Sequence, residues 1–102
     1  MNVSGEVTKS GVEPAALPAL VQQVAAVPRL ELRGLMAIPA PTENPEEQHR
    51  QLRRLRQLRD ETAARGFHLD TLSMGMSDDL EIAIAEGATI VRVGRAIFGE
   101  RR

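Results

Sequence analysis

The stretch TLSMGMSDD, from Thr71 to Asp79, decides the fold that the sequence predicts. Its first half belongs to a short β-like run, and Gly75 then permits a turn. Ser77 suits the cap of a helix, and the two aspartates that follow it favour the positive end of the helix dipole. The stretch therefore predicts a strand over Leu69–Met74, a turn, and a helix over Asp78–Glu86.

The same alternation continues on both sides of this stretch. Strand-like runs occupy Asn2–Ser4, Leu30–Ile38 and Thr89–Val93, while helical spacing covers Pro14–Val27 and Pro45–Arg65. Short strands that alternate with longer helices indicate βαβ units around a parallel sheet. We therefore expect an α/β fold with about four strands and three to four helices.

The length of the chain limits how much of such a fold it can form. A closed barrel of eight βα units needs roughly 200 residues or more, and this chain has 102. It therefore forms one domain at most, and that domain corresponds to about half a barrel. The outer strands of a four-stranded sheet would keep unpaired edges, which favours association with a missing half or with a second copy.

The helix predicted over Pro45–Arg65 has the clearest boundaries. Asn44 suits the cap, Pro45 the first turn, and Gly66 the end. The helix is rich in arginine, which suits either an anionic partner or a solvated face. Because Glu46 and other acids share the helix, the sequence favours the solvated face.

Composition excludes several classes of protein. The chain has no cysteine, a formal net charge of -1 and a pI of about 6.1, and its only aromatic residues are Phe67 and Phe98. A nucleic-acid-binding protein would normally show a basic surplus, so we expect no nucleic-acid partner. No secretory leader or long apolar run occurs, so we expect a cytoplasmic protein without a membrane segment. Neither histidine, His49 or His68, has metal-ligand spacing, and we expect no metal site.

Four segments together resemble a known family. They are NVSGEVTKSG (Asn2–Gly11), LRGLMAIPAP (Leu32–Pro41), TLSMGMSDD (Thr71–Asp79) and VRVGRAIFG (Val91–Gly99). In this order and spacing they resemble the C-terminal half of the pyridoxal 5′-phosphate (PLP)-binding homeostasis proteins, whose fold resembles the N-terminal barrel of alanine racemase. The resemblance implies the C-terminal half of a parallel (β/α)8 TIM-type barrel. It also implies PLP as the cofactor, with no catalytic turnover.

The resemblance implies that the last two strand-to-helix turns hold the cofactor phosphate. Ser77 would bind it through its hydroxyl and backbone N–H, and Arg92, Gly94 and Arg95 would belong to the phosphate cradle. Many relatives carry threonine or serine at the position of Arg95, so the resemblance implies a phosphate contact only for the backbone N–H of this residue. Turns of this kind present N–H groups to an anion, and glycine lets a phosphate approach the backbone.

Other roles stay open for several of these residues. Gly75 and Gly94 also suit turn geometry alone, and Arg92 could pair with a carboxylate such as Asp70 or Asp79. Met36 could border the cofactor ring, although core filling is the more common use of methionine, here as at Met74 and Met76.

The lysine content bears on cofactor attachment. Twelve of the thirteen basic residues are arginine, and Lys9 is the only lysine. The resemblance places the family's Schiff-base lysine in the N-terminal half, and Lys9 matches a second lysine in the TKSG loop. Two functions therefore remain: a non-catalytic PLP-binding homeostasis protein, or a fragment that does not bind the cofactor alone and associates with a complementary half or with itself.

Overall fold

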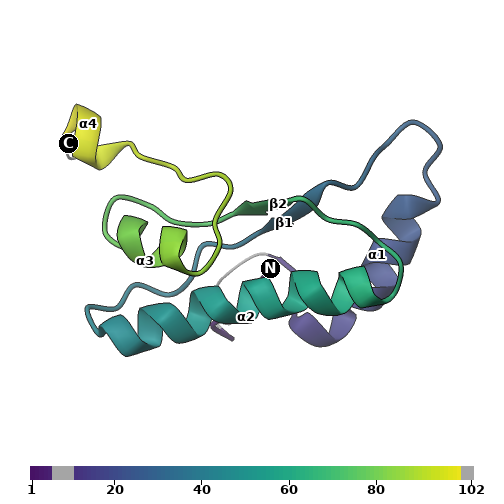
Figure 1. Ribbon diagram of the computed structural model, residues 1–102, viewed down its shortest axis with the longest axis horizontal. Coiled ribbons are helices and arrows are strands. Elements are labelled where there is room, and N and C mark those ends of the chain that lie inside the picture. Colours follow the sequence, from purple (N-terminus) through teal and green to yellow (C-terminus); the bar gives the residue numbers. More distant parts are fainter. Residues whose placement is uncertain (6–10, 100–102) are drawn as a thin grey trace.

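The computed structural model describes residues 1–5 and 11–99. A short 3-10 turn, Pro14–Ala16, leads into helix α1. The remaining elements follow the order that the sequence predicts, with helices after strands (Figure 1). Their bounds are α1 Leu17–Ala25, β1 Gly34–Met36, α2 Pro45–Ala64, β2 Thr71–Ser73, α3 Leu80–Ala85 and α4 Arg95–Phe98.

The two strands lie side by side and parallel, connected by α2. Gly34 pairs with Thr71, and Met36 pairs with Ser73. A β-carbon at residue 34 would overlap the carbonyl oxygen of Thr71, so glycine allows the two strands to approach this closely. A parallel pair with a helical crossover is the unit from which α/β sheets are built, and the predicted fold class is confirmed.

Segments on both sides of the pair occupy the places of further strands. On the β2 side, Ser73 forms a bridge with Ile90, and the Met74 N–H donates to the Ile90 carbonyl at 3.1 Å. On the β1 side, the amino group of Met1 donates to the Met36 carbonyl at 2.7 Å. The spatial order is therefore the N-terminal segment, β1, β2 and the segment around Ile90.

The predicted number of strands is wrong for the described residues. They contain one sheet of two strands rather than four. Residues 2–4 include a turn, and the predicted strand Thr89–Val93 contributes only the bridge at Ile90. Both segments would be outer strands with a neighbour on one side only, so half of their backbone groups have no ladder partner to keep them extended.

Helix α2 begins and ends where the sequence predicts. The Asn44 side chain accepts a hydrogen bond from the Glu46 N–H at 3.0 Å, and Pro45 is the first helical residue. Gly66 adopts a φ of +96°, a left-handed conformation that ends the helix. These local interactions explain why the boundaries of this helix could be read from the sequence.

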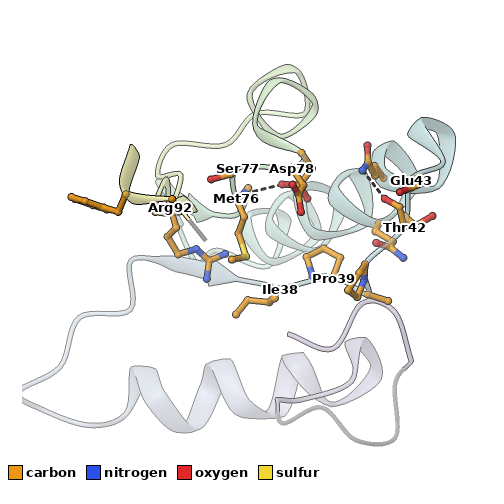
Figure 2. Close-up of a pocket in the computed structure, with 17 residues that line it drawn as sticks. Ile38, Pro39, Thr42, Glu43, Met76, Ser77, Asp78 and Arg92 are labelled. Atoms are coloured by element: carbon orange, nitrogen blue, oxygen red, sulfur yellow. Dashed lines mark hydrogen bonds between the residues drawn. The ribbon is translucent and has the colours of Figure 1, made fainter. Parts of the chain in front are cut away.

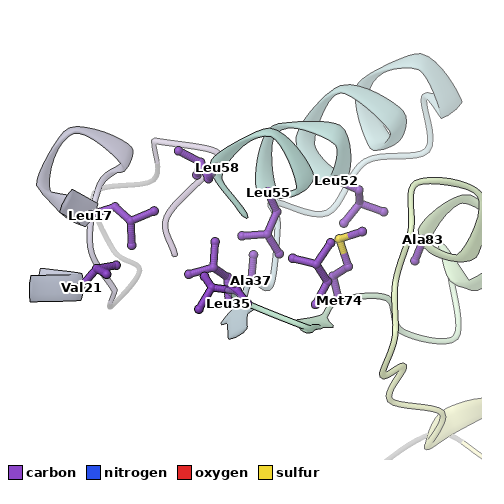
Figure 3. Close-up of a cluster of buried hydrophobic side chains, with 11 residues drawn as sticks. Leu17, Val21, Leu35, Ala37, Leu52, Leu55, Leu58, Met74 and Ala83 are labelled. Atoms are coloured by element: carbon purple, nitrogen blue, oxygen red, sulfur yellow. The ribbon is translucent and has the colours of Figure 1, made fainter. Parts of the chain in front are cut away.

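The hydrophobic core lies on one face of the sheet, between the strands and α2. Figure 3 shows the leucines of α2 directed toward the residues of the strands, with α1 closing one end. Leu52, Leu55, Leu72 and Met74 are the largest side chains that are fully buried. Core filling is therefore confirmed for Met74.

The opposite face of the sheet is exposed and apolar. Leu35 and Ala37 are buried, while the alternate residues Met36 and Ile38 are 50% and 44% exposed. Paired residues point to the same side of a sheet, so the register also places Ile90, which is 50% exposed, on this face. Core filling is therefore wrong for Met36. No helix in residues 1–5 and 11–99 is long and apolar enough to cross a bilayer.

Candidate functional site

An open groove lies at the carboxyl ends of the two strands (Figure 2). Its walls are the loop that follows β1, the turn that follows β2, and the segment between Arg92 and the end of α4. Gln48 and Gln51 of α2 line it as well. The carboxyl edge of a parallel sheet is where α/β folds usually place their ligands, so the position fits a binding site.

Four of the six residues predicted for cofactor binding line this groove. They are Gly75, Ser77, Arg92 and Gly94. The Arg92 N–H donates to the Gly75 carbonyl at 2.9 Å, which holds the segments leading into the two turns side by side. The structure therefore brings together two turns that are well separated in sequence.

The other two predicted residues have different positions. Arg95 is the first residue of α4, directly after Gly94, and its backbone alone is described. Met36 is not among the residues that line the groove, whereas Ile38, two positions later on the same face, is. Lys9 lies outside the described residues. The apolar wall that the sequence places at Met36 is formed by Ile38 and by Met76, which is 46% exposed rather than in the core.

Gly75 and Gly94, the two groove glycines predicted from the sequence, differ in what they do. Gly75 has a φ of +102°, and a β-carbon there would lie 2.5 Å from Ala83 Cβ and 3.2 Å from Val91 Cγ1. Its identity is therefore explained by backbone conformation and by the close packing of α3. A β-carbon on Gly94 would meet no atom of the described chain within 4 Å. The backbone at Gly94 thus faces open space.

The turn after β2 is closed by Asp79. The Met76 N–H donates to Asp79 Oδ1 at 2.7 Å, and the Asp79 N–H donates to the Met76 carbonyl at 3.2 Å. Helix α3 begins at Leu80 with Asp79 as its N-cap residue. The prediction of Ser77 as the cap of a helix that starts at Asp78 is therefore wrong, because the Asp79 carboxylate closes the preceding turn and delays the helix. The Met76 N–H is engaged within that turn.

Arg92 uses a backbone partner in place of the predicted carboxylates. Its Nη2 donates to the Ala37 carbonyl at 2.9 Å, which bridges from the segment beyond β2 to the end of β1. Asp70 is instead paired with Arg33 at 2.5 Å, and Asp79 closes its turn. In Figure 2 the Arg92 side chain extends toward the side of the groove formed by Ile38 and Pro39.

One donor of Arg92 stays unsatisfied. Its Nε is buried and has no hydrogen-bond partner among the described residues. A buried donor without a partner costs roughly 1–3 kcal/mol, so such a group calls for an explanation. Arg92 lines the groove, and a shift of its side chain toward an anionic ligand there would give Nε an acceptor, so the residues present fit an anionic group.

Charge in the groove is mixed. The acidic residues Glu43, Asp78 and Asp79 line it together with Arg92. Glu43 and Asp78 are exposed, so water and salt weaken their repulsion of an anion. Among the described residues that line the groove, Arg92, the Ser77 hydroxyl and backbone N–H groups are the ones that can attract a phosphate.

A buried carboxylate at the C-terminal end of α3 could not be recognised from the sequence. The Glu86 side chain is 5% exposed and contacts three side chains of α2: His49 Nδ1 at 2.8 Å, Arg53 at 3.0 Å and Arg56 at 3.2 Å. The spacing of these three residues places them on one face of α2, which could have indicated a shared partner. Nothing in the sequence identifies that partner as Glu86. Two of the arginines predicted to form a solvated face thus have an internal partner.

The surroundings of Glu86 act on its pKa in opposite directions. Burial alone would raise the pKa of Glu86, but the hydrogen bonds from His49 and Arg53 and the charges of Arg53 and Arg56 lower it below its ordinary value of about 4.5. A carboxyl whose pKa is lowered in the folded state stabilises that state above the unfolded pKa. The stabilisation is lost as the pH falls through the lowered value, so Glu86 keeps its negative charge near neutral pH.

Comparison with known proteins agrees with this arrangement. The family model described as "Alanine racemase, N-terminal domain" matches residues 1–102, and the chain belongs to this family. A pyridoxal phosphate homeostasis protein of Pseudomonas aeruginosa is 57% identical over 101 residues. That alignment covers 99% of this chain but 43% of the relative, so the chain spans less than half the length of the curated relatives it matches.

Solved structures share the arrangement as well. A structure described as an unknown protein from Bifidobacterium adolescentis superposes with a TM-score of 0.88 at 44% identity, covering 96% of this chain and 40% of the other. PipY from Synechococcus elongatus, solved with PLP bound, superposes with a TM-score of 0.80 at 34% identity, covering 96% of this chain and 48% of PipY. The fold is therefore that of part of a longer α/β protein.

Proposed function

We propose that this chain forms the phosphate-binding half of a PLP site in a protein of PLP homeostasis. The observation that carries the proposal is the buried, unpartnered Nε of Arg92 in a groove that also contains Ser77 and Gly94. The name of the Pseudomonas aeruginosa relative and the PLP bound to PipY support the choice of ligand. The groove lies at the carboxyl edge of the parallel strands, where a phosphate is commonly held.

Each residue has a proposed role toward the cofactor. Ser77 would bind the phosphate through its hydroxyl and backbone N–H, and Gly94 and Arg95 through their backbone N–H groups at the start of α4. Arg92 would supply positive charge and its unsatisfied donor. Gly75 keeps the turn after β2 in shape, and Met36 would extend the apolar wall toward the ring.

We propose a binding role without catalysis. When bound, PLP supplies an aldehyde that can condense with amines, and Lys9 is the only lysine side chain here that could react with it. Of the acids that line the groove, Asp79 already accepts a hydrogen bond from the Met76 N–H through one carboxylate oxygen, which suits a structural role. The names of the curated relatives describe homeostasis proteins, which supports this proposal.

Equilibrium dialysis of the 102-residue chain against PLP tests the proposed function. We expect PLP to bind and inorganic phosphate to compete with it, because the proposed contacts are to the phosphate. Pyridoxal, which lacks that group, should bind at least about tenfold more weakly, the worth of one good charge-assisted hydrogen bond. Equal affinity for pyridoxal and PLP would contradict the phosphate site, and the absence of PLP binding would contradict a site that works in this chain alone.

A second function is favoured by the exposed sheet face of Met36, Ile38 and Ile90. We propose that the remaining half of a barrel covers this face, since the matched relatives are more than twice as long as the aligned region. In this case the chain would bind PLP only as part of the assembled barrel. Neighbouring apolar side chains left open on one sheet face often mark an interface.

Mixing with the complementary half tests this association. We expect a one-to-one complex, by analytical ultracentrifugation, with the part of the Pseudomonas aeruginosa relative that this chain does not match. The double variant Met36→Lys, Ile90→Lys should weaken it at least about a hundredfold, because two apolar side chains lose their burial. Glu61→Lys, on the exposed side of α2, is the matched control and should form the complex normally. A homodimer that excludes the added half, or no complex, would contradict the proposal.

A further inference from the structure

Helix α3 has little apolar contact of its own. It is six residues long, and Ala83 is its only fully buried residue. Ile84 is 58% exposed, and Ile82 is only partly buried against the core. An isolated helix of this length is unstable in water, and its position has to be fixed by contacts with other elements.

Glu86 provides such a contact at the C-terminal end of α3. It is the C-cap residue, and its own N–H donates to the Ile82 carbonyl at 2.9 Å. Its buried side chain contacts His49, Arg53 and Arg56, which we call the Glu86 cluster. Because α2 is held against the sheet by its fully buried leucines, the cluster attaches α3 to the most firmly packed helix.

The other end of α3 continues into the turn of the groove. The Ala83 N–H donates to the Asp79 carbonyl at 2.9 Å, and Asp79 in turn holds the Met76 N–H. Ala83 also packs directly against Gly75, where even one added carbon would clash. A shift of α3 would therefore move the turn from Gly75 to Asp79, which includes Ser77.

We propose that Glu86 is a positioning residue for the phosphate site. With His49, Arg53 and Arg56 it fixes α3 on α2, and α3 holds the turn Gly75–Asp79 in the shape that presents Ser77 to the groove. The inference rests on the proposed function, because it concerns the affinity of the same groove for the phosphate of PLP. Glu86 itself is not among the residues that line the groove, so it acts through α3.

Amide hydrogen exchange and PLP dialysis together test this role. In Glu86→Gln, which loses the charge and keeps the shape, we expect faster exchange at Met76 and Ala83 and unchanged exchange in the middle of α2. PLP affinity should fall about tenfold, as for the loss of one well-placed hydrogen bond, while the weak binding of pyridoxal stays the same. A general loss of stability would lower both affinities. Arg53→Gln removes one half-exposed partner and should give a smaller change of the same kind if Glu86→Gln fails to fold.

The matched control is Asp70→Asn. It breaks the pair of Asp70 with Arg33, which also joins segments distant in sequence but lies before the strands rather than at the groove. Exchange at Met76 and affinity for PLP should not change in this variant. Unchanged exchange in Glu86→Gln would overturn the cluster as a support of α3, and faster exchange with unchanged PLP affinity would overturn the positioning role. If the parent chain binds no PLP, the proposed function fails, and the positioning role fails with it even when the exchange result supports the cluster.

Discussion

Replacement of Gly75 by alanine should destabilise the chain by about 2–5 kcal/mol. The left-handed φ of +102° costs an L-residue roughly 1–2 kcal/mol, and overpacking adds about 1–3 kcal/mol. The added carbon would meet Ala83 Cβ at 2.5 Å and Val91 Cγ1 at 3.2 Å, and the first of these separations is too short for two non-bonded carbon atoms. Urea denaturation followed by circular dichroism measures the change.

Gly66→Ala is the matched control for this prediction. Gly66 has a similar φ of +96°, but a β-carbon there would meet nothing within 4 Å. Gly66→Ala should therefore lower the free energy of unfolding only by the cost of the left-handed backbone conformation, roughly 1–2 kcal/mol. An equal decrease in the free energy of unfolding of the two variants would mean that α3 does not pack closely on Gly75.

Gly94→Asp should leave the fold intact and abolish PLP binding. No described atom lies within 4 Å of the added β-carbon, so folding meets no obstacle. The new carboxylate would stand beside the proposed phosphate position, and like charges brought together cost several kcal/mol. We expect at least about a hundredfold loss of PLP affinity by equilibrium dialysis, with an unchanged urea midpoint.

Gly94→Asn separates charge from size in this experiment. The amide has nearly the same shape as the carboxylate and carries no charge, so it should retain more affinity than aspartate. If the aspartate variant binds PLP as the parent does, the phosphate does not lie at Gly94. If asparagine and aspartate lose affinity equally, space rather than charge limits the site.

The local parts of the fold were predictable, because their determinants are adjacent in sequence. Helix α2 begins at Asn44 and ends before Gly66 through contacts within a few residues, and the sequence predicted both. Where the determinant was a neighbour in space, the prediction failed. The segment Thr89–Val93 has strand-like residues, yet it forms a single bridge because its other edge has no partner.

The site was predictable in composition but not in detail. The sequence and its family resemblance selected Gly75, Ser77, Arg92 and Gly94, and all four line one groove. They did not predict that the Asp79 carboxylate would accept from the Met76 N–H and close the turn after β2. An acidic residue at this position is equally typical of the first turn of a helix. The partners of Arg92 and Glu86 also escaped prediction, because both reach across elements far apart in sequence.

The reach of Arg92 to the Ala37 carbonyl has a consequence for the loop after β1. A ligand that attracts the guanidinium competes with that carbonyl for the same cation. Ala37 leads into the loop whose residues Ile38 and Pro39 form the facing wall of the groove. Loss of the hydrogen bond to Ala37 would release this loop, so ligand binding would be coupled to a change in the shape of that wall. Through Arg92, binding of a ligand in the groove would therefore also change the position of the segment that leads into α2.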